Sequence, residues 1–245
     1  MALDKVVDSA ALHDELVSIA DSIRAKGGTD AQFASAAEMK AAVDAIETGG
    51  GSDTIKIATN QKDAYGMFDS ISFDNPDTEL DITFKTRSFT GSMDFFMSGT
   101  QNIKKLILNM PNIDKVSFER AFNARNSLRI IDFTNAAKPL SAREMFYGSI
   151  NLETIIGELD FSESSNNTNA FSSCASLITV SFVPESIKRT ITFGDCYVLS
   201  AESIQSIIDG LATVTSTQTL TMDELNPISE SQKAQITSKN WTLVQ

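Results

Sequence analysis

The chain has 245 residues, of which 42% are apolar and 21% are charged, a composition typical of a globular protein with one or two domains. Its 32 Asp and Glu residues outnumber its 20 Lys and Arg residues, and the net charge of -12 argues against nucleic acid and anionic membranes as partners. No apolar run is long enough for a signal peptide or a membrane span, so we expect a soluble protein made in a cytoplasm.

Histidine and cysteine, on which many catalytic centres depend, are scarce in this sequence. His13 is the only histidine, and Cys174 and Cys196 are the only cysteines, which excludes a zinc site built from several histidines. Because no nucleophile or cluster of metal ligands accompanies His13, we interpret it as a solvated residue on a helix face. We therefore expect no enzymatic activity, no metal and no cofactor.

The first 48 residues predict a helical segment, followed by a Gly-rich hinge at residues 49–52. Two helices this short either pack on the rest of the chain or pair with copies of themselves or a partner, and the hinge favours the second arrangement. The first helix carries large aliphatic residues spaced by four, three and four positions, which form one apolar stripe. We expect attachment and assembly, as a homotrimer, through this stripe, which consists of Leu12, Leu16, Ile19 and Ile23.

A repeat dominates the middle of the chain. Alternation of apolar and polar residues first predicts short strands at residues 55–57, 71–73 and 80–84. Five segments then share one template, in which a large apolar residue stands six positions before an aliphatic one, and their first residues are 25, 24, 25 and 22 positions apart. A fixed period in this range predicts a solenoid. The segments begin at Met97, Phe122, Phe146, Phe171 and Phe193.

The residues after each template strengthen this prediction. Leu106 and Leu108 follow the first segment, and Val180 and Phe182 follow the fourth, which gives the L-x-x-L-x-L pattern of a leucine-rich repeat. We therefore expect residues 53–199 to form a leucine-rich-repeat solenoid, an α/β repeat fold with short strands. No clean repeat can be aligned before the first segment, so we expect that part to be irregular.

The chain after Leu199 predicts a C-terminal α/β capping module at residues 200–245, which would protect the exposed end of the solenoid. The expected elements are a helix that begins after Ser200, a strand at residues 219–222, a helix that begins at Ser229 with Gln232 three positions on, and a strand at residues 241–244.

The side of the strands that faces away from the core is the best candidate for a binding surface. If the first Leu of the pattern and the residues three and five positions later point inward, the residues between them point outward. Three isoleucines among these outward positions suggest a contact surface, because contiguous exposed apolar residues usually mark contacts. The candidate binding residues are Lys105, Ile107, Ile130, Asp132, Thr154, Ile156, Thr179 and Ser181.

The third coil departs from the pattern at Gly157, so we expect a slip or bulge within residues 152–161.

Asp132 and Asp160 form one pair of acids on neighbouring coils. They occur in matching Asp-Phe pairs, which would place them on adjacent strands at a separation that a glycosidase could use. Because no aromatic platform or raised-pKa environment accompanies them, we interpret both as solvated acids.

Cys174 and Cys196 each follow their template phenylalanine by three positions, so we expect them to stack in adjacent coils. We interpret them as small buried residues in equivalent positions, because free cysteine is among the most buried residue types. A disulfide is geometrically possible, but an origin in the cytoplasm argues against it.

The segment at residues 171–182, F-x-x-C-x-S-L-x-x-V-x-F, resembles the BspA-like leucine-rich repeats of bacterial surface proteins and some bacteriophage proteins. Residues 20–29, ADSIRAKGGT, are similar to the openings of tail and other structural proteins of phages of Gram-positive bacteria. Residues 199–211 and 238–243 resemble the ends of phage proteins of this kind. The resemblance implies a virion protein of the tail, baseplate or fibre that contacts the host surface without catalysis.

The partners that this resemblance implies are other virion proteins, bound through the N-terminal helices, and a glycan or protein of the host surface. Two other functions remain open on the same solenoid. One is a surface-polysaccharide depolymerase, and the other is a purely architectural decoration protein of the capsid or tail.

Overall fold

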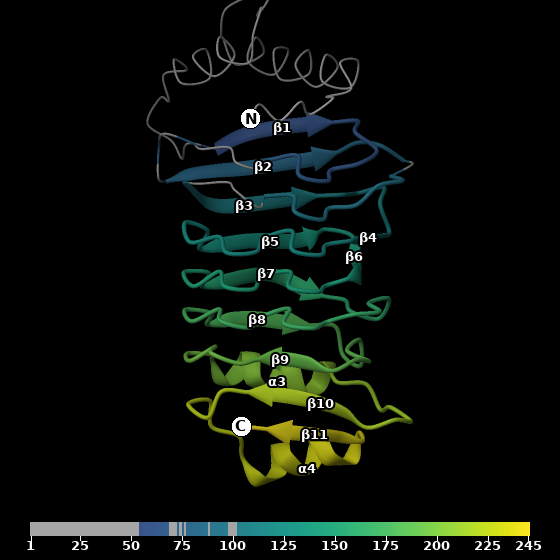
Figure 1. The fold of residues 1–245 in the computed structure, drawn as a ribbon, viewed down its shortest axis with the longest axis vertical. Coiled ribbons are helices and arrows are strands. Elements are labelled where there is room, and N and C mark those ends of the chain that lie inside the picture. The colour runs from purple at the N-terminus through teal and green to yellow at the C-terminus, as the bar shows by residue number, and fades with distance from the viewer. Residues whose placement is uncertain (1–53, 69–72, 74, 76, 88, 98–101) are drawn as a thin grey trace, which may run out of the picture.

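The protein is a parallel β-solenoid of about seven turns, seen in a computed structural model (Figure 1). The structure describes residues 54–68, 73, 75, 77–87, 89–97 and 102–245. The predicted N-terminal helices with their stripe of Leu12, Leu16, Ile19 and Ile23, the hinge at residues 49–52 and His13 lie outside these residues. The expectation of a repeat solenoid built on short strands is confirmed.

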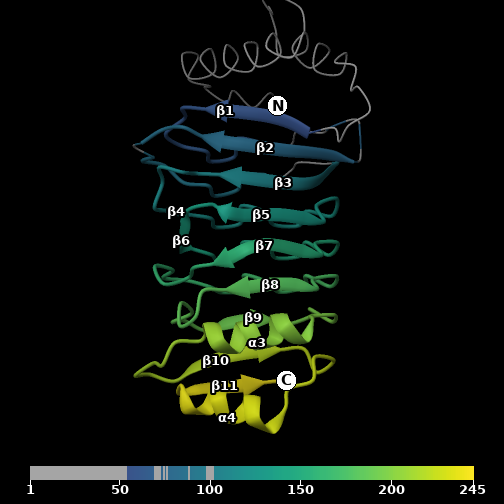
Figure 2. The same ribbon diagram turned by 180° about the vertical axis from the view of Figure 1, so that it is seen from behind.

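Six parallel strands form the main sheet, in the order β1-β2-β3-β5-β7-β8. They stack one below another along the long axis, because each coil returns to the same side one repeat later (Figures 1 and 2). A short pair, β4 (Lys115–Ser117) and β6 (Lys138–Ser141), forms a separate two-stranded sheet. The main strands are β1 (Thr54–Thr59), β2 (Thr78–Phe84), β3 (Ile103–Asn109), β5 (Ile130–Asn135), β7 (Thr154–Leu159) and β8 (Thr179–Phe182).

Below β8 the sheet gives way to two helices and a second, three-stranded sheet (Figure 1). The predicted elements after Leu199 are confirmed: Ser200 caps the first helix, and Ser229 and Gln232 form a capping box at the second. The elements are β9 (Ile191–Phe193), α3 (Ala201–Gly210), β10 (Gln218–Met222), α4 (Glu230–Ser238) and β11 (Trp241–Val244).

Helix α3 lies along the edge of β8 and replaces the next strand there. The hydroxyl of Ser203 accepts a hydrogen bond from the backbone N–H of Val180 at 3.0 Å. The hydroxyl of Ser206 accepts one from the N–H of Phe182 at 2.9 Å. Two edge donors that a further strand would have satisfied are thus paired with helix side chains, which removes part of the edge as a template for other chains.

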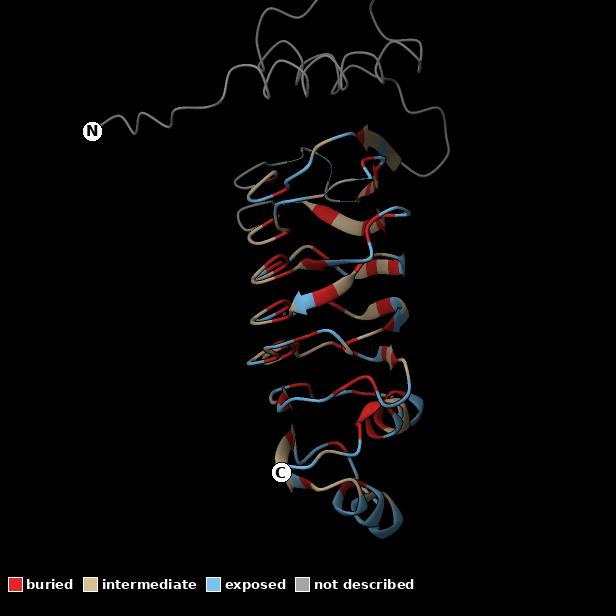
Figure 3. Cartoon of the chain, turned by 90° about the vertical axis from the view of Figure 1, so that its right-hand side faces the viewer, coloured by how far each residue is buried: buried red, intermediate tan, exposed pale blue. Residues whose placement is uncertain are grey.

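A ladder of phenylalanine rings fills the centre of the coils. The rings of Phe122 and Phe146, and those of Phe146 and Phe171, stack with centroids 5.4 Å apart in each pair. The predicted ladder of these three residues is confirmed, and Phe193 extends it by one more coil. Figure 3 shows buried segments at every level of the solenoid, so the repeat forms one continuous core.

The repeat also includes a coil before Met97, where none could be aligned from the sequence. The backbone N–H of Phe68 donates to the carbonyl of Phe96 at 2.8 Å, just as that of Phe122 donates to the carbonyl of Met145 at 2.9 Å. Phe68 is therefore the template residue of an earlier coil. Phe68 lies 29 residues before Met97, a spacing longer than the 22 to 25 residues between the other segments, so the regular period did not predict this coil. A longer loop within a coil leaves the stacking of the coils unchanged.

The expected irregularity in the third coil is a bulge in β7. The pairing of β7 with β8 shifts register between Thr154 and Glu158. Gly157 lies at the shift with φ of 89°, and a Cβ at this position would come within 2.7 Å of the backbone nitrogen of Thr134. Glycine is required here both for its backbone conformation and for the close approach of β5.

Candidate functional site

The predicted outward residues occupy the side of the main sheet that faces away from the phenylalanine ladder, called the outer face below. The residues between them, Leu106, Ile131, Ile155 and Val180, are at most 1% exposed, which confirms the predicted alternation. Neither α3 nor α4 lies over the sheet, because both follow it along the axis (Figures 1 and 2). The outer face comprises the candidates Lys105, Ile107, Ile130, Asp132, Thr154, Ile156, Thr179 and Ser181 with the outward residues of β1 and β2.

The strand register arranges these side chains in rows that run along the solenoid axis. The first row begins at Glu79 of β2, which lies beside Lys105 with 3.6 Å between Nζ and Oε2 and accepts a hydrogen bond from Thr54 at 3.2 Å. Lys105 pairs in turn with Ile130, and Ile130 with Thr154. Thr179 of β8 lies beside Thr154 and completes the row. The charged end of this row is thus near β1 and its neutral end near β8.

The second row alternates acids with isoleucines. Register pairs place Asp81 beside Ile107, Ile107 beside Asp132, and Asp132 beside Ile156. Ile156 is 39% exposed, so the bulge at Gly157 does not turn it inward. Ile107 and Ile130 are partly buried. The three isoleucines are therefore staggered across two rows and separated by polar neighbours.

A third row is a ladder of side-chain amides that sequence patterns did not reveal. Asn109 Nδ2 donates to Asp81 Oδ1 at 2.8 Å, and Asn135 Nδ2 donates to Asn109 Oδ1 at 3.1 Å. Further along the axis, the hydroxyl of Ser181 donates to the carbonyl of Gly157 at 3.1 Å. The occurrence of Asn at the ends of both β3 and β5 was the signal that could have predicted this ladder.

The expected equivalence of Asp132 and Asp160 is wrong. Asp132 pairs across the ladder with Ile156, whereas Asp160 follows the end of β7, because the matching Asp-Phe pairs are offset by the bulge. Asp160 instead lies 3.1 Å from Lys138 Nζ. Burial tends to raise the pKa of Asp160, but hydrogen bonds from Ser162 and the ion pair with Lys138 outweigh it and hold the pKa below its ordinary value. A carboxylate in this state is suited to structural pairing.

The two cysteines stack in adjacent coils as predicted, and both are free and fully buried. The thiol of Cys174 donates to the carbonyl of Phe146 at 3.1 Å, and that of Cys196 to the carbonyl of Phe171 at 3.0 Å. Ser149 makes the same contact one coil earlier, with its hydroxyl 2.6 Å from the carbonyl of Phe122. The neighbouring thiol of Cys196 and burial both raise the pKa of the Cys174 thiol well above its ordinary value, so it is a poor nucleophile.

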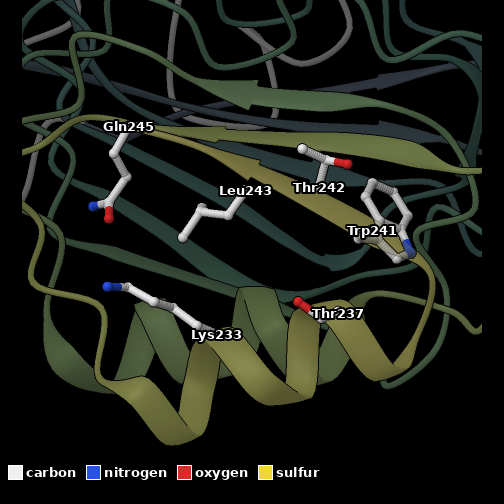
Figure 4. A pocket seen from close by; sticks show the side chains of 6 residues that line it. All are labelled: Lys233, Thr237, Trp241, Thr242, Leu243 and Gln245. Carbon is white, nitrogen blue, oxygen red and sulfur yellow. The ribbon is translucent and has the colours of Figure 1, made fainter.

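A shallow pocket of about 500 Å³ lies between α4 and β11 near the C-terminal end (Figure 4). Lys233 and Thr237 reach it from the helix, and Leu243 and Gln245 from the strand side. The amine of Lys233 pairs with Glu230 at 2.8 Å. The Trp241 ring nitrogen donates to the carbonyl of Ala212 at 2.8 Å, so this indole is committed to packing.

Within the described part of the chain, no group of three or more His, Cys, Asp or Glu side chains could hold a metal ion. No helix in the same residues has the length and apolar character needed to cross a bilayer. Comparison with known proteins found no matching family model, no matching curated protein and no matching solved structure.

Proposed function

We propose that this chain is a non-enzymatic structural and adhesion protein of a bacteriophage particle, built on a BspA-like leucine-rich-repeat body. Residues 1–48 would attach it to other virion proteins, and the solenoid would present a binding surface to the host cell. The observation that carries this proposal is the outer face, a sheet surface in which partly exposed isoleucines alternate with acids, hydroxyls and amides over successive coils.

The chemistry of the outer face supports binding by repetition. Each coil contributes one or two side chains, so a single coil offers a weak contact, and several coils in register offer a regular array. Burial of one isoleucine contributes roughly 1.5–3 kcal/mol, and the hydroxyl and amide rows supply hydrogen bonds that fix orientation. Copies held together at the N-terminus would multiply such contacts through avidity.

The C-terminal elements fit the role of a solenoid cap. Ser203 and Ser206 of α3 satisfy the backbone donors of the last main strand, β8. A protein displayed in many copies needs such protection, because open strand edges promote association between copies.

The test is retention of the full-length protein on cell walls of candidate Gram-positive hosts, with soluble reducing ends measured in the same samples. Retention without release of reducing ends supports the proposal, and release of reducing ends supports a depolymerase. The absence of both retention and release supports a purely architectural protein. Ile130→Asp should weaken retention at least about tenfold, equivalent to about 1.4 kcal/mol. Leu140→Asp, which alters an exposed leucine on β6, is the matched control.

Immunogold labelling of intact particles tests the virion assignment separately. Gold at the tail tip or baseplate supports a receptor-binding role, and gold over the capsid supports decoration. Labelling absent from purified particles that contain all their other structural proteins would refute both.

A further inference from the structure

A second surface lies at the turns that lead into β7, β8 and α3, along one edge of the outer face (Figure 1). Large apolar side chains concentrate there with an exposure that is high for their types. Their exposed fractions are 44% for Ile150, 45% for Ile178, 42% for Tyr197, 49% for Val198 and 66% for Leu225. These five residues are called the corner stripe below.

Backbone contacts show that the coils carrying the corner stripe stack directly on one another along the solenoid axis. The N–H of Ser176 donates to the carbonyl of Ile150 at 3.1 Å, so the coil of Ile178 stacks directly on that of Ile150. The N–H of Ser200 donates to the carbonyl of Ile178 at 2.9 Å, which adds the coil of Tyr197 and Val198.

The loop that carries Leu225 joins the corner stripe at its far end. The side-chain amide of Asn226 donates to the carbonyl of Cys196, next to Tyr197, at 2.6 Å. With a spacing of about 4.8 Å between coils, the three steps from Ile150 to Leu225 span about 14 Å, or between two and three turns of an α-helix.

Acidic side chains border the corner stripe. Asp195 accepts a hydrogen bond from the Tyr197 hydroxyl at 3.3 Å, and Glu224 is an exposed neighbour of Leu225. The charge of Asp195 raises the pKa of the Tyr197 hydroxyl above its ordinary value. At the other end, Arg129 is neutralised by an ion pair with Glu153. The surface is therefore apolar along its centre and negative at the end near Tyr197 and Leu225.

We propose that the corner stripe binds an amphipathic helix of a partner protein that carries basic side chains beside its apolar ones. Apolar side chains at helical spacing would cover the stripe, and Lys or Arg residues would pair with the acidic border. This assignment does not rest on host binding by the outer face, and it concerns the turns along the edge of that face.

Charge and polarity favour a basic partner helix over three other occupants of the corner stripe. A second copy carries the same net charge of -12, so two acidic borders would repel each other. Residues 1–48 contain nine Asp and Glu residues against four Lys and Arg residues, so the chain's own N-terminal segment is negatively charged and would be repelled by the acidic side chains of the stripe. A neutral oligosaccharide would leave the three aliphatic side chains and Leu225 poorly matched.

The test uses two labelled probe peptides of about 18 residues, or about five helical turns, with the same amphipathic pattern. One is built from Leu and Lys, and the other from Leu and Glu. Fluorescence anisotropy with the full-length protein should show binding of the Leu/Lys peptide and at least about tenfold weaker binding of the Leu/Glu peptide. Equal affinity for both peptides would overturn the charge assignment.

Variants then locate the binding surface. The double variant Ile178→Ser and Val198→Ser should weaken binding of the Leu/Lys peptide at least about tenfold, and so should the double reversal Asp195→Lys and Glu224→Lys. Leu140→Ser, an exposed leucine of β6, is the matched control and should bind as wild type does. Circular dichroism checks that every variant is folded. If the folded stripe variants keep wild-type affinity, the peptide binds elsewhere and the proposal is wrong.

Discussion

The rings of Phe171 and Phe193 stack with their centroids 4.8 Å apart and their planes 12° from parallel. Their spacing of 22 residues is the shortest among the five repeat segments, yet their stack is tighter than that of Phe146 on Phe171, at 5.4 Å. The contact between coils is therefore set where the rings meet, and the loops absorb the difference in length.

This ladder predicts a large effect of a single truncation. Phe146 is fully buried and stacks on rings of the coils before and after it. Phe146→Ala should lower the free energy of unfolding by about 3–5 kcal/mol, through lost burial and the cavity that remains. Tyr147→Ala, at an exposed neighbour, should change it by less than about 0.5 kcal/mol. Urea unfolding followed by circular dichroism measures both, and equal midpoints for the two variants would contradict the packing.

The bulge in β7 can be tested with two glycines of different surroundings. Gly157 and Gly148 both have positive φ, 89° and 69°, but a Cβ would come within 2.7 Å of the backbone at Gly157 and no closer than 3.9 Å at Gly148. Gly148→Ala should cost about 1 kcal/mol of stability from its backbone conformation, and Gly157→Ala should cost more because it also pushes β5 and β7 apart. Thermal unfolding of both variants measures these losses of stability. Equal losses for the two variants would show that a Cβ at Gly157 meets no clash.

The buried thiols predict resistance to modification. Both cysteines are fully buried, so a thiol reagent cannot reach them, and the raised pKa of Cys174 leaves little of that thiol as thiolate at about pH 8. An aromatic disulfide reagent should leave the native protein unmodified and react with two thiols once the chain is unfolded in guanidinium. Fast reaction of either thiol in the folded state would show that the coils open locally at this position.

The ion pair between Arg120 and Glu144 should make a pH-dependent contribution to stability. Glu144 Oε2 lies 2.6 Å from Arg120 Nε, and this hydrogen bond lowers the pKa of Glu144 below its ordinary value of 4.5. The contribution is fully present above that ordinary value and is lost as the pH falls through the lowered pKa. Glu144→Gln should therefore destabilise the protein at neutral pH and approach wild-type stability once the pH has fallen below the lowered pKa of Glu144. In an Arg120→Met background the substitution should have a smaller effect, and an unchanged effect would rule out the pairing.

Assembly through the N-terminal segment stays a prediction, because Leu12, Leu16, Ile19 and Ile23 lie outside the described residues. Sedimentation of the full chain should give a multiple of 26.6 kDa, with three copies expected. The double variant Leu16→Asp and Ile19→Asp should reduce it to one copy and leave the solenoid folded. A monomeric wild-type protein at micromolar concentration would contradict the stripe hypothesis.

The sequence by itself determined the features that repeat at a fixed spacing. The phenylalanine ladder, the stacked Cys174 and Cys196, and the alternation around Leu106 and Ile131 all follow from one template that each coil copies. The capped helices after Ser200 and Ser229 were also predictable, because a cap is a local hydrogen bond within four residues.

Tertiary structure alone decided which residues of different coils meet. The coil of Phe68, the offset of Asp160 from Asp132 and the corner stripe from Ile150 to Leu225 depend on loops of unequal length and on the bulge at Gly157. Loop length has little energetic cost and leaves no regular pattern in the sequence, whereas the backbone hydrogen bonds between coils fix the register. Neighbours across coils are therefore set by that register, and counting along the chain cannot find them.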